Sequence, residues 1–172
     1  MRLRLIFLLA LVVAFSSVAR AQLAGYVLYT GANTGLANSS WEMGPTIGLY
    51  GEGSLTPLIA LGVDGRGVIL AKNGEKLDSG LIGPRLSFHP HLFRIAPYTE
   101  FLFGMGHTFV PAQGSAAQIE VTKFEYSLLG GVDYTLVPRL DWRVIEFSYG
   151  GFTAFTGSYH PKMLSSGLVL RF

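Results

Sequence analysis

The chain has 172 residues, no cysteine and nearly balanced charge, with 13 Lys and Arg against 11 Asp and Glu. The absence of cysteine excludes thiolate catalysis, disulfides and structural zinc–thiolate sites. The basic residues are scattered among acidic ones, so the sequence has no basic cluster of the kind that neutralises nucleic-acid phosphates. This length fits one domain, and no linker or low-complexity tract divides it.

The first 21 residues have the organisation of a secretory signal peptide. Arg2 and Arg4 precede an apolar run over residues 5–15, and a small-x-small sequence over residues 19–21 ends the segment. The apolar run is shorter than the roughly 20 residues of a transmembrane helix, so we predict cleavage before Gln22. Cleavage removes three basic residues and no acidic one, which leaves ten against eleven and a net charge of −1.

Residues 22–172 predict an all-β domain. No stretch after Arg20 has 18 apolar residues without a polar residue or glycine, which excludes helical membrane spans. Apolar and polar residues instead alternate with the period of two that is typical of half-buried β-strands. We predict eight strands, over residues 22–31, 46–52, 58–70, 80–88, 94–108, 124–136, 141–150 and 162–172.

The predicted connections alternate in length, at about 13, 5, 9, 5, 14, 4 and 10 residues. Outer-membrane β-barrels have long extracellular loops and short periplasmic turns. The alternation therefore predicts an eight-stranded, antiparallel, up-and-down transmembrane β-barrel with both termini in the periplasm. The surface-exposed loops predicted by this topology cover residues 33–41, 72–78, 111–122 and 153–160.

The faces of the strands follow from the rule that apolar residues of such barrels point to lipid and polar or small ones point inward. In the fifth strand Phe101, Phe103 and Met105 share one face, and Glu100 lies on the other. By this rule the inward-facing charged residues are Glu52, Asp64, Arg66, Arg85, Glu100, Asp133, Glu146 and Arg171. An eight-stranded interior is just wide enough to be filled by side chains, so we expect a salt-bridged interior, with a narrow pore as the alternative.

The seventh strand fits the rule less well, because Glu146 inside the barrel leaves Arg143 on the lipid side. Arg143 lies near a predicted short turn, where its head group could reach the membrane interface. Candidates for the aromatic girdles at the two membrane surfaces, or otherwise for ordinary sheet packing, are Tyr26, Tyr29, Tyr134, Trp142 and Tyr149.

The last two strands, GGVDYTLVPRLDWRVIEFSYG and MLSSGLVLRF, carry a family resemblance. Over about residues 22–172 the chain resembles the small outer-membrane β-barrel family, the OmpA-like and OmpX-like eight-stranded domains. The resemblance implies assembly by the outer-membrane insertion machinery, which reads a final strand with Leu168, Leu170 and a terminal Phe172. Ser166 departs from this signal, because that position is usually apolar. No peptidoglycan-binding domain follows the barrel, so an anchoring role is not expected.

A lipid A-modifying acyl hydrolase is the enzymatic alternative, because some small outer-membrane barrels resemble this chain yet act on acyl chains. His107 and Thr108, or Ser158 and His160, would bring a histidine and a hydroxyl together near the barrel rim. The His-x-Ser-Asn pattern of the deacylases is missing, so we predict no catalytic residues.

We expect no metal or other cofactor. His89 and His91 flank Pro90, but no third ligand lies nearby in the sequence. The Gly-x-Gly sequences lack a following helix and are not nucleotide-binding fingerprints.

A soluble, periplasmic lipocalin-like barrel remains possible and would reverse the faces, with apolar residues lining a cavity. The sequence favours a small monomeric outer-membrane barrel in contact with membrane lipid or lipopolysaccharide, with a structural or surface-interaction role carried by its loops, and no nucleic-acid partner.

Overall fold

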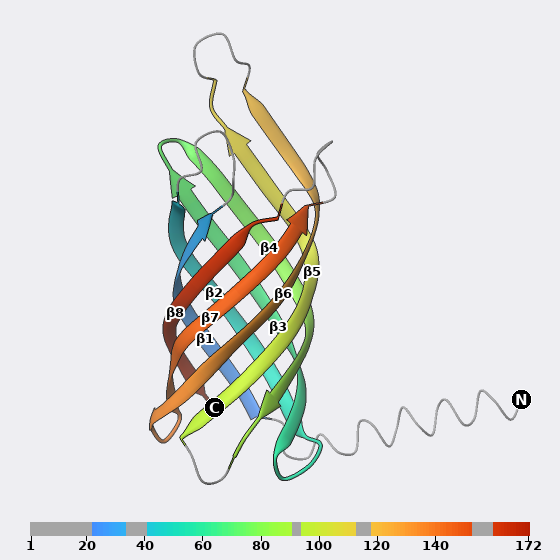
Figure 1. Cartoon of the computed structure of the whole chain (residues 1–172), viewed down its shortest axis with the longest axis vertical. Coiled ribbons are helices and arrows are strands. Elements are labelled where there is room, and N and C mark those ends of the chain that lie inside the picture. The colour runs from blue at the N-terminus through green and yellow to red at the C-terminus, as the bar shows by residue number, and fades with distance from the viewer. Residues whose placement is uncertain (1–21, 34–40, 91–93, 113–117, 153–159) are drawn as a thin grey trace, which may run out of the picture.

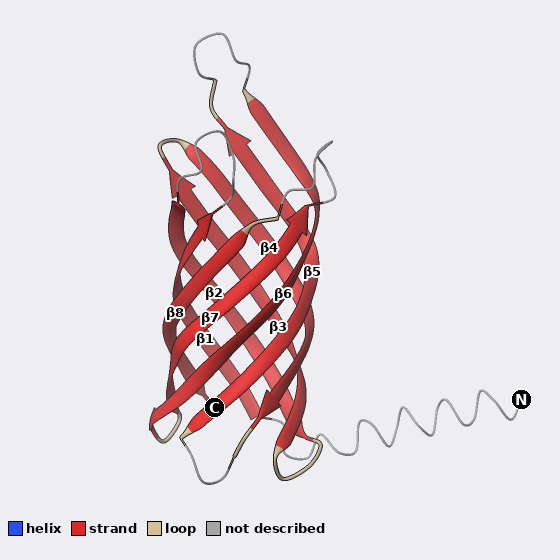
Figure 2. Cartoon of the chain, viewed as in Figure 1, coloured by secondary structure: helices blue, strands red, loops and turns tan. Residues whose placement is uncertain are grey.

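A computed structural model of the chain describes residues 22–33, 41–90, 94–112, 118–152 and 160–172, and every regular element in these ranges is a strand (Figures 1 and 2). None of the described residues forms a helix of the length and apolar character that crossing a membrane requires. The predicted signal peptide lies outside the described residues. The strands are β1 (Gln22–Asn33), β2 (Trp41–Ser54), β3 (Ile59–Lys72), β4 (Glu75–Phe88), β5 (Ile95–Val110), β6 (Ile119–Val137), β7 (Leu140–Phe152) and β8 (Lys162–Arg171).

The eight strands form one closed antiparallel barrel. Each strand pairs with the next along the chain, and β8 pairs with β1 to close the sheet. The backbone N–H of Phe172 continues this seam by donating to the carbonyl of Leu23 at 2.8 Å. The predicted fold class is confirmed, because closure leaves every strand paired on both sides along most of its length.

The first residues of β1 and the C-terminus lie at the same end of the barrel as the connections from β2 to β3, β4 to β5 and β6 to β7 (Figure 1). We call this the turn end and the opposite one the loop end. At the loop end the hairpin of β5 and β6 extends beyond the neighbouring strands (Figure 1). The start of β1 and the C-terminus are therefore at the opposite end of the barrel from the extended β5–β6 hairpin.

The predicted strand boundaries are mostly too short, and one connection was predicted wrongly. β4 begins at Glu75 rather than at residue 80, because β3 and β4 are joined by a two-residue turn at Asn73 and Gly74. Both residues have positive φ angles, 51° and 90°, which is the geometry that Asn-Gly favours in tight hairpins. The predicted long loop over residues 72–78 is thus mostly strand. The predicted loop over 153–160 lies almost wholly outside the described residues.

Along each strand, alternate side chains face an apolar exterior and a packed interior. Phe101, Phe103 and Met105 are exposed on the outside, whereas Glu100 and Leu102 are buried inside. Other large apolar side chains, including Val27, Ile47, Val63, Leu128 and Leu168, extend the apolar exterior around the barrel. A lipocalin-like barrel would have the opposite arrangement, so the lipocalin-like assignment of the faces is wrong.

The interior has an apolar layer near the loop end. It consists of Ala32, Val68, Leu70, Leu77 and Met163, all buried in one cluster. These residues come from the loop-end segments of β1, β3, β4 and β8. The layer lies between the loop end and the charged residues in the middle of the interior.

Candidate functional site

Three arginines lie across the middle of the barrel interior, and each contacts at least two carboxylates. Arg66 of β3, Arg85 of β4 and Arg143 of β7 are all buried. Arg66 donates to Glu100 at 2.6 Å and to Glu146 at 2.7 Å. All three arginines thus have partners on other strands, and Arg66 and Arg143 also pair with an acid on their own strand.

The carboxylates connect the arginines into a closed ring. Glu100 bridges Arg66 and Arg85. Asp133 bridges Arg85, at 3.2 Å, and Arg143, which donates to both of its oxygens at 2.8 and 3.1 Å. Glu146 bridges Arg143, at 3.0 Å, and Arg66, at 2.7 Å, which closes the ring. We call these six residues the arginine ring.

Two further carboxylates surround the arginine ring, together with three tyrosines, Tyr26, Tyr50 and Tyr98. Asp64 accepts from Arg66 at 3.1 Å, and Glu52 accepts from Arg85 at 3.3 Å. The phenol of Tyr98 donates to Glu146 at 2.6 Å, and its ring lies 3.8 Å from the guanidinium carbon of Arg85. Such guanidinium stacking on aromatic faces adds to the ion pairs where water is excluded. The whole arrangement takes residues from every strand except β8.

Tyr26 also belongs to this interior, which corrects its predicted place in an aromatic girdle. Its side chain is buried, and its hydroxyl donates to Asp64 at 2.8 Å. The ring also lies 4.6 Å from the guanidinium carbon of Arg143. The remaining girdle candidates are exposed on the outer surface: Tyr29, Tyr134, Trp142 and Tyr149.

The predicted lipid-facing position of Arg143 is wrong, because β7 contains a β-bulge. Arg143 and Glu146 both point inward, and Val144 and Ile145 between them both face outward. The pairing of β7 with β8 shifts register between Arg143 and Glu146. A bulge inserts one residue into the alternation, so two residues three positions apart reach the same face.

Arg171 lies apart from the arginine ring, near the turn end. Its guanidinium is half-buried and donates to Asp141 at 2.7 Å and to Thr135 at 3.2 Å. The other seven charged residues of the predicted interior set lie together in the arginine ring or bonded to it. Sequence reasoning missed Arg143 and the three ring-stacking tyrosines, although the adjacent apolar pair of Val144 and Ile145 marks the bulge.

A polar pocket of about 130 Å³ opens at the turn end, below the arginine ring. Within or beside it, Ser87 donates to Glu52 at 2.6 Å, and Nε2 of His89 lies 3.1 Å from both the serine hydroxyl and the carboxylate. In a nucleophilic triad the histidine takes the serine proton through one nitrogen and is held by the acid through the other. Here one nitrogen meets both groups and the serine proton already goes to Glu52. The cluster therefore lacks the geometry of an activated nucleophile.

The other histidines also occupy structural positions. Nδ1 of His107 lies 2.9 Å from the hydroxyl of Thr122 across the β5–β6 hairpin. Nδ1 of His160 lies 3.1 Å from the carbonyl of Gly150 and its ring stacks on Tyr149. His91 and Ser158 lie outside the described residues. Among the described residues no group of three His, Cys, Asp or Glu side chains is arranged to hold a metal ion.

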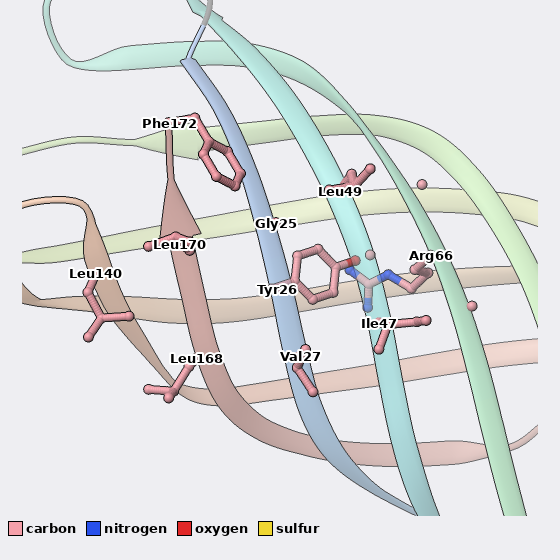
Figure 3. Close-up of a pocket in the computed structure, with 13 residues that line it drawn as sticks. Gly25, Tyr26, Val27, Ile47, Leu49, Arg66, Leu140, Leu168, Leu170 and Phe172 are labelled. Carbon is pink, nitrogen blue, oxygen red and sulfur yellow. The ribbon is translucent and has the colours of Figure 1, made fainter.

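The outer surface has one large apolar hollow, of about 790 Å³, over β1, β2, β3 and the end of β8 (Figure 3). Its lining includes glycines at positions 25, 65 and 67. Leu49, Leu168 and Phe172 also line it (Figure 3). A side chain added at Gly65 would meet nothing within 4 Å. The hollow is open to the outside, and the inward-facing side chains of Tyr26 and Arg66 also line it (Figure 3).

The fold matches solved structures of bacterial barrels. The surface protein NspA of Neisseria is similar over 88% of this chain and 97% of its own, with a TM-score of 0.58 and 16% identity. Small outer-membrane β-barrels share this fold. The attachment invasion locus protein Ail of Yersinia pestis covers 88% of this chain and 97% of its own, with a TM-score of 0.53 and 12% identity. The N-terminal barrel domain of OprF from Pseudomonas aeruginosa is similar over 89% of this chain and 100% of its own, with a TM-score of 0.50 and 14% identity.

No protein-family model matches the sequence, and no curated protein is significantly similar to it. The likeness to solved barrels therefore extends to the eight-stranded, OmpA-like fold.

Proposed function

We propose that this protein is a monomeric outer-membrane barrel with a sealed interior, which acts at the cell surface through its loop end and has no catalytic activity. In this proposal residues 1–21 are a cleaved signal peptide and residues 22–172 are the barrel domain. Its surroundings are membrane lipid and lipopolysaccharide. The loop end faces outward, and both termini lie in the periplasm.

The apolar exterior is the observation that carries this proposal. Large apolar side chains are exposed on all eight strands, for example Leu61 on β3, Ile82 on β4 and Phe147 on β7. A soluble protein rarely exposes a continuous apolar surface of this extent. Tyr29, Tyr134, Trp142 and Tyr149 are also on this exterior, which supports their assignment to membrane-interface girdles.

The arginine ring supports a sealed barrel over a pore. Its arginines and carboxylates contact one another directly across the interior, at distances that leave no room for water between them. The apolar layer of Ala32, Val68, Leu70, Leu77 and Met163 adds a second closure near the loop end. A conducting lumen would need both layers to move apart.

The end of β8 supports the proposed assembly by the insertion machinery. Leu168, Leu170 and Phe172 all face outward and are exposed. They form the edge of the outer hollow at the seam where β8 meets β1 (Figure 3). A partner that reads the last strand before closure would meet these three side chains on one face.

Fractionation and electrophoresis of the expressed protein test the proposal. We expect the mature chain in the outer-membrane fraction, with a folded band that changes mobility on boiling. In planar bilayers we expect no stepwise conductance. A soluble periplasmic species would overturn the membrane assignment, and reproducible single-channel steps would overturn the sealed interior in favour of a pore.

A further inference from the structure

Glu125 of β6 is a buried carboxylate that the arginine ring does not use. Its side chain is fully buried and points into the barrel. Neither of its oxygens has a hydrogen-bond partner among the described residues. The buried hydroxyl of Ser79 on β4 lies close enough to this carboxylate for a weak interaction, but it forms no regular hydrogen bond with it. A buried ionised carboxylate is unfavourable unless it is compensated, so this position requires an explanation.

A small cavity lies next to this carboxylate, and hydroxyl groups dominate its polar lining. Its volume is about 10 Å³, the room of about one water-sized sphere. Hydroxyls line it from five positions: Thr30, Thr46, Ser127, Ser148 and Ser165. Three of these are already bonded to each other, since Oγ1 of Thr30 lies 2.7 Å from Thr46 and 2.9 Å from Ser165. The cavity thus offers neutral oxygen atoms beside one carboxylate.

Three charged side chains line the cavity, namely the acids Glu125 and Glu146 and the basic Arg66. Arg66 also lines the cavity, but its three donor groups are committed to Asp64, Glu100 and Glu146. Glu146 is the other acid at the cavity, and it is already paired with two arginines. None of the described residues therefore gives Glu125 a cationic partner.

We propose that this cavity binds one small monovalent cation, such as Na⁺ or K⁺, with Glu125 as the charged ligand and the surrounding hydroxyls as neutral ligands. Carboxylate and other oxygen ligands suit hard cations. A single carboxylate balances one positive charge, whereas Ca²⁺ and Mg²⁺ sites generally use more acidic ligands or several waters, for which the cavity is too small. This internal cation site goes beyond the proposed role of the barrel at the cell surface.

Thermal unfolding of the folded protein in detergent micelles tests the site. The chloride salts of Na⁺, K⁺ and choline would be compared at equal ionic strength, because choline is too large for the cavity. A ligand that binds only the folded state raises the unfolding temperature with its concentration. We expect the unfolding temperature to rise and then saturate in NaCl or KCl relative to choline chloride.

Two variants separate the site from general salt effects. Glu125→Gln keeps the size of the side chain and removes its charge, so it should fold and lose the difference between small cations and choline. Glu120→Gln changes an exposed carboxylate of the same strand. This variant should keep the difference in unfolding temperature between small cations and choline. Equal unfolding temperatures in all three salts for the wild-type protein, or an unchanged difference in Glu125→Gln, would overturn the proposal in favour of a neutral glutamic acid or a bound water.

Crystals soaked in thallium(I), a monovalent cation with anomalous scattering, provide a direct readout. The wild-type protein should give an anomalous peak beside Glu125, within coordination distance of the cavity hydroxyls. The peak should be absent in Glu125→Gln. A wild-type interior without such a peak would contradict the cation site even if stability varied with salt.

Discussion

Ser166 illustrates how one polar side chain on the lipid face can serve the backbone. Its hydroxyl donates to the carbonyl of Arg143 at 3.0 Å, and the indole N–H of Trp142 donates to the same hydroxyl at 3.2 Å. Arg143 stands at the β-bulge, where the regular pairing of β7 and β8 is interrupted. A carbonyl left unpaired within a membrane is costly. The departure of Ser166 from the apolar pattern therefore has a local structural reason.

We expect Ser166→Ala to destabilise the barrel by about 1 kcal/mol, because it removes the hydroxyl that donates to the carbonyl of Arg143. Equilibrium unfolding in urea from lipid vesicles would measure this loss. Ser166→Thr keeps the hydroxyl and should remain close to the wild-type protein. If the alanine and threonine variants were equally stable, the hydroxyl would have no role at the bulge.

At the scale of the elements, the hairpin of β3 and β4 depends on its two-residue turn. Fourteen residue pairs connect these strands, down to Lys72 and Glu75 next to the turn. Gly74 has a φ of 90°, a conformation that residues with a side chain rarely adopt. The turn also fixes the register that places Asp64, Arg66 and Arg85 inside the barrel.

Gly74→Ala should therefore lower the free energy of unfolding by about 1 to 2 kcal/mol. Gly80→Ala is the matched control on the same hairpin, because a Cβ at Gly80 would meet nothing within 4 Å and the residue has no positive φ. Urea unfolding of both variants measures the difference. Equal stability of the two variants would show that the left-handed turn is not required.

At the scale of the whole molecule, the arginine ring joins strands that are distant in sequence. Arg66 and Glu146 are 80 residues apart, and Arg85 and Asp133 are 48 residues apart. Buried ion pairs add little net stability over apolar packing, but the loss of one partner leaves uncompensated charge behind. The ring is therefore expected to favour one closed arrangement of all the strands over alternative registers.

Arg143→Met tests the ring, because it removes the guanidinium that holds Asp133 and Glu146. We expect a loss of about 3 to 5 kcal/mol in the free energy of unfolding. Arg139→Met, in the exposed turn between β6 and β7, should have little effect. A small effect for Arg143→Met would mean that the two carboxylates find other partners and that the ring is not the main closure.

The apolar exterior can be tested at the middle of β2, where Ile47 faces outward with 54% of its surface exposed. In a bilayer Ile47→Arg should cost about 2 to 4 kcal/mol, because it places a charge in the hydrocarbon region. Ala112→Arg, beyond the end of β5 at the loop end, should cost little. Similar tolerance at both positions in lipid vesicles would contradict the membrane-facing assignment.

The local pattern of residues was enough to predict much of this architecture. The alternation of Phe101, Phe103 and Met105 with Glu100 assigned the faces of the fifth strand as the structure has them. The tight turn at Asn73 and Gly74 also had a recognisable signal, although it was interpreted as part of a longer loop. The inward-facing position of Arg143 was not predicted, because a bulge changes the period of two at a single residue.

The sequence by itself determined that this chain forms an eight-stranded barrel with apolar residues outside and charged residues inside, because a strand sends alternate side chains to opposite faces wherever it lies. Only the tertiary structure decided which arginine meets which carboxylate. That choice depends on the register of every strand and on closure between β1 and β8, which bring residues from most of the chain to one level of the interior. The same closure placed Glu125 beside a hydroxyl-lined cavity, with no cationic partner among the residues that the structure describes.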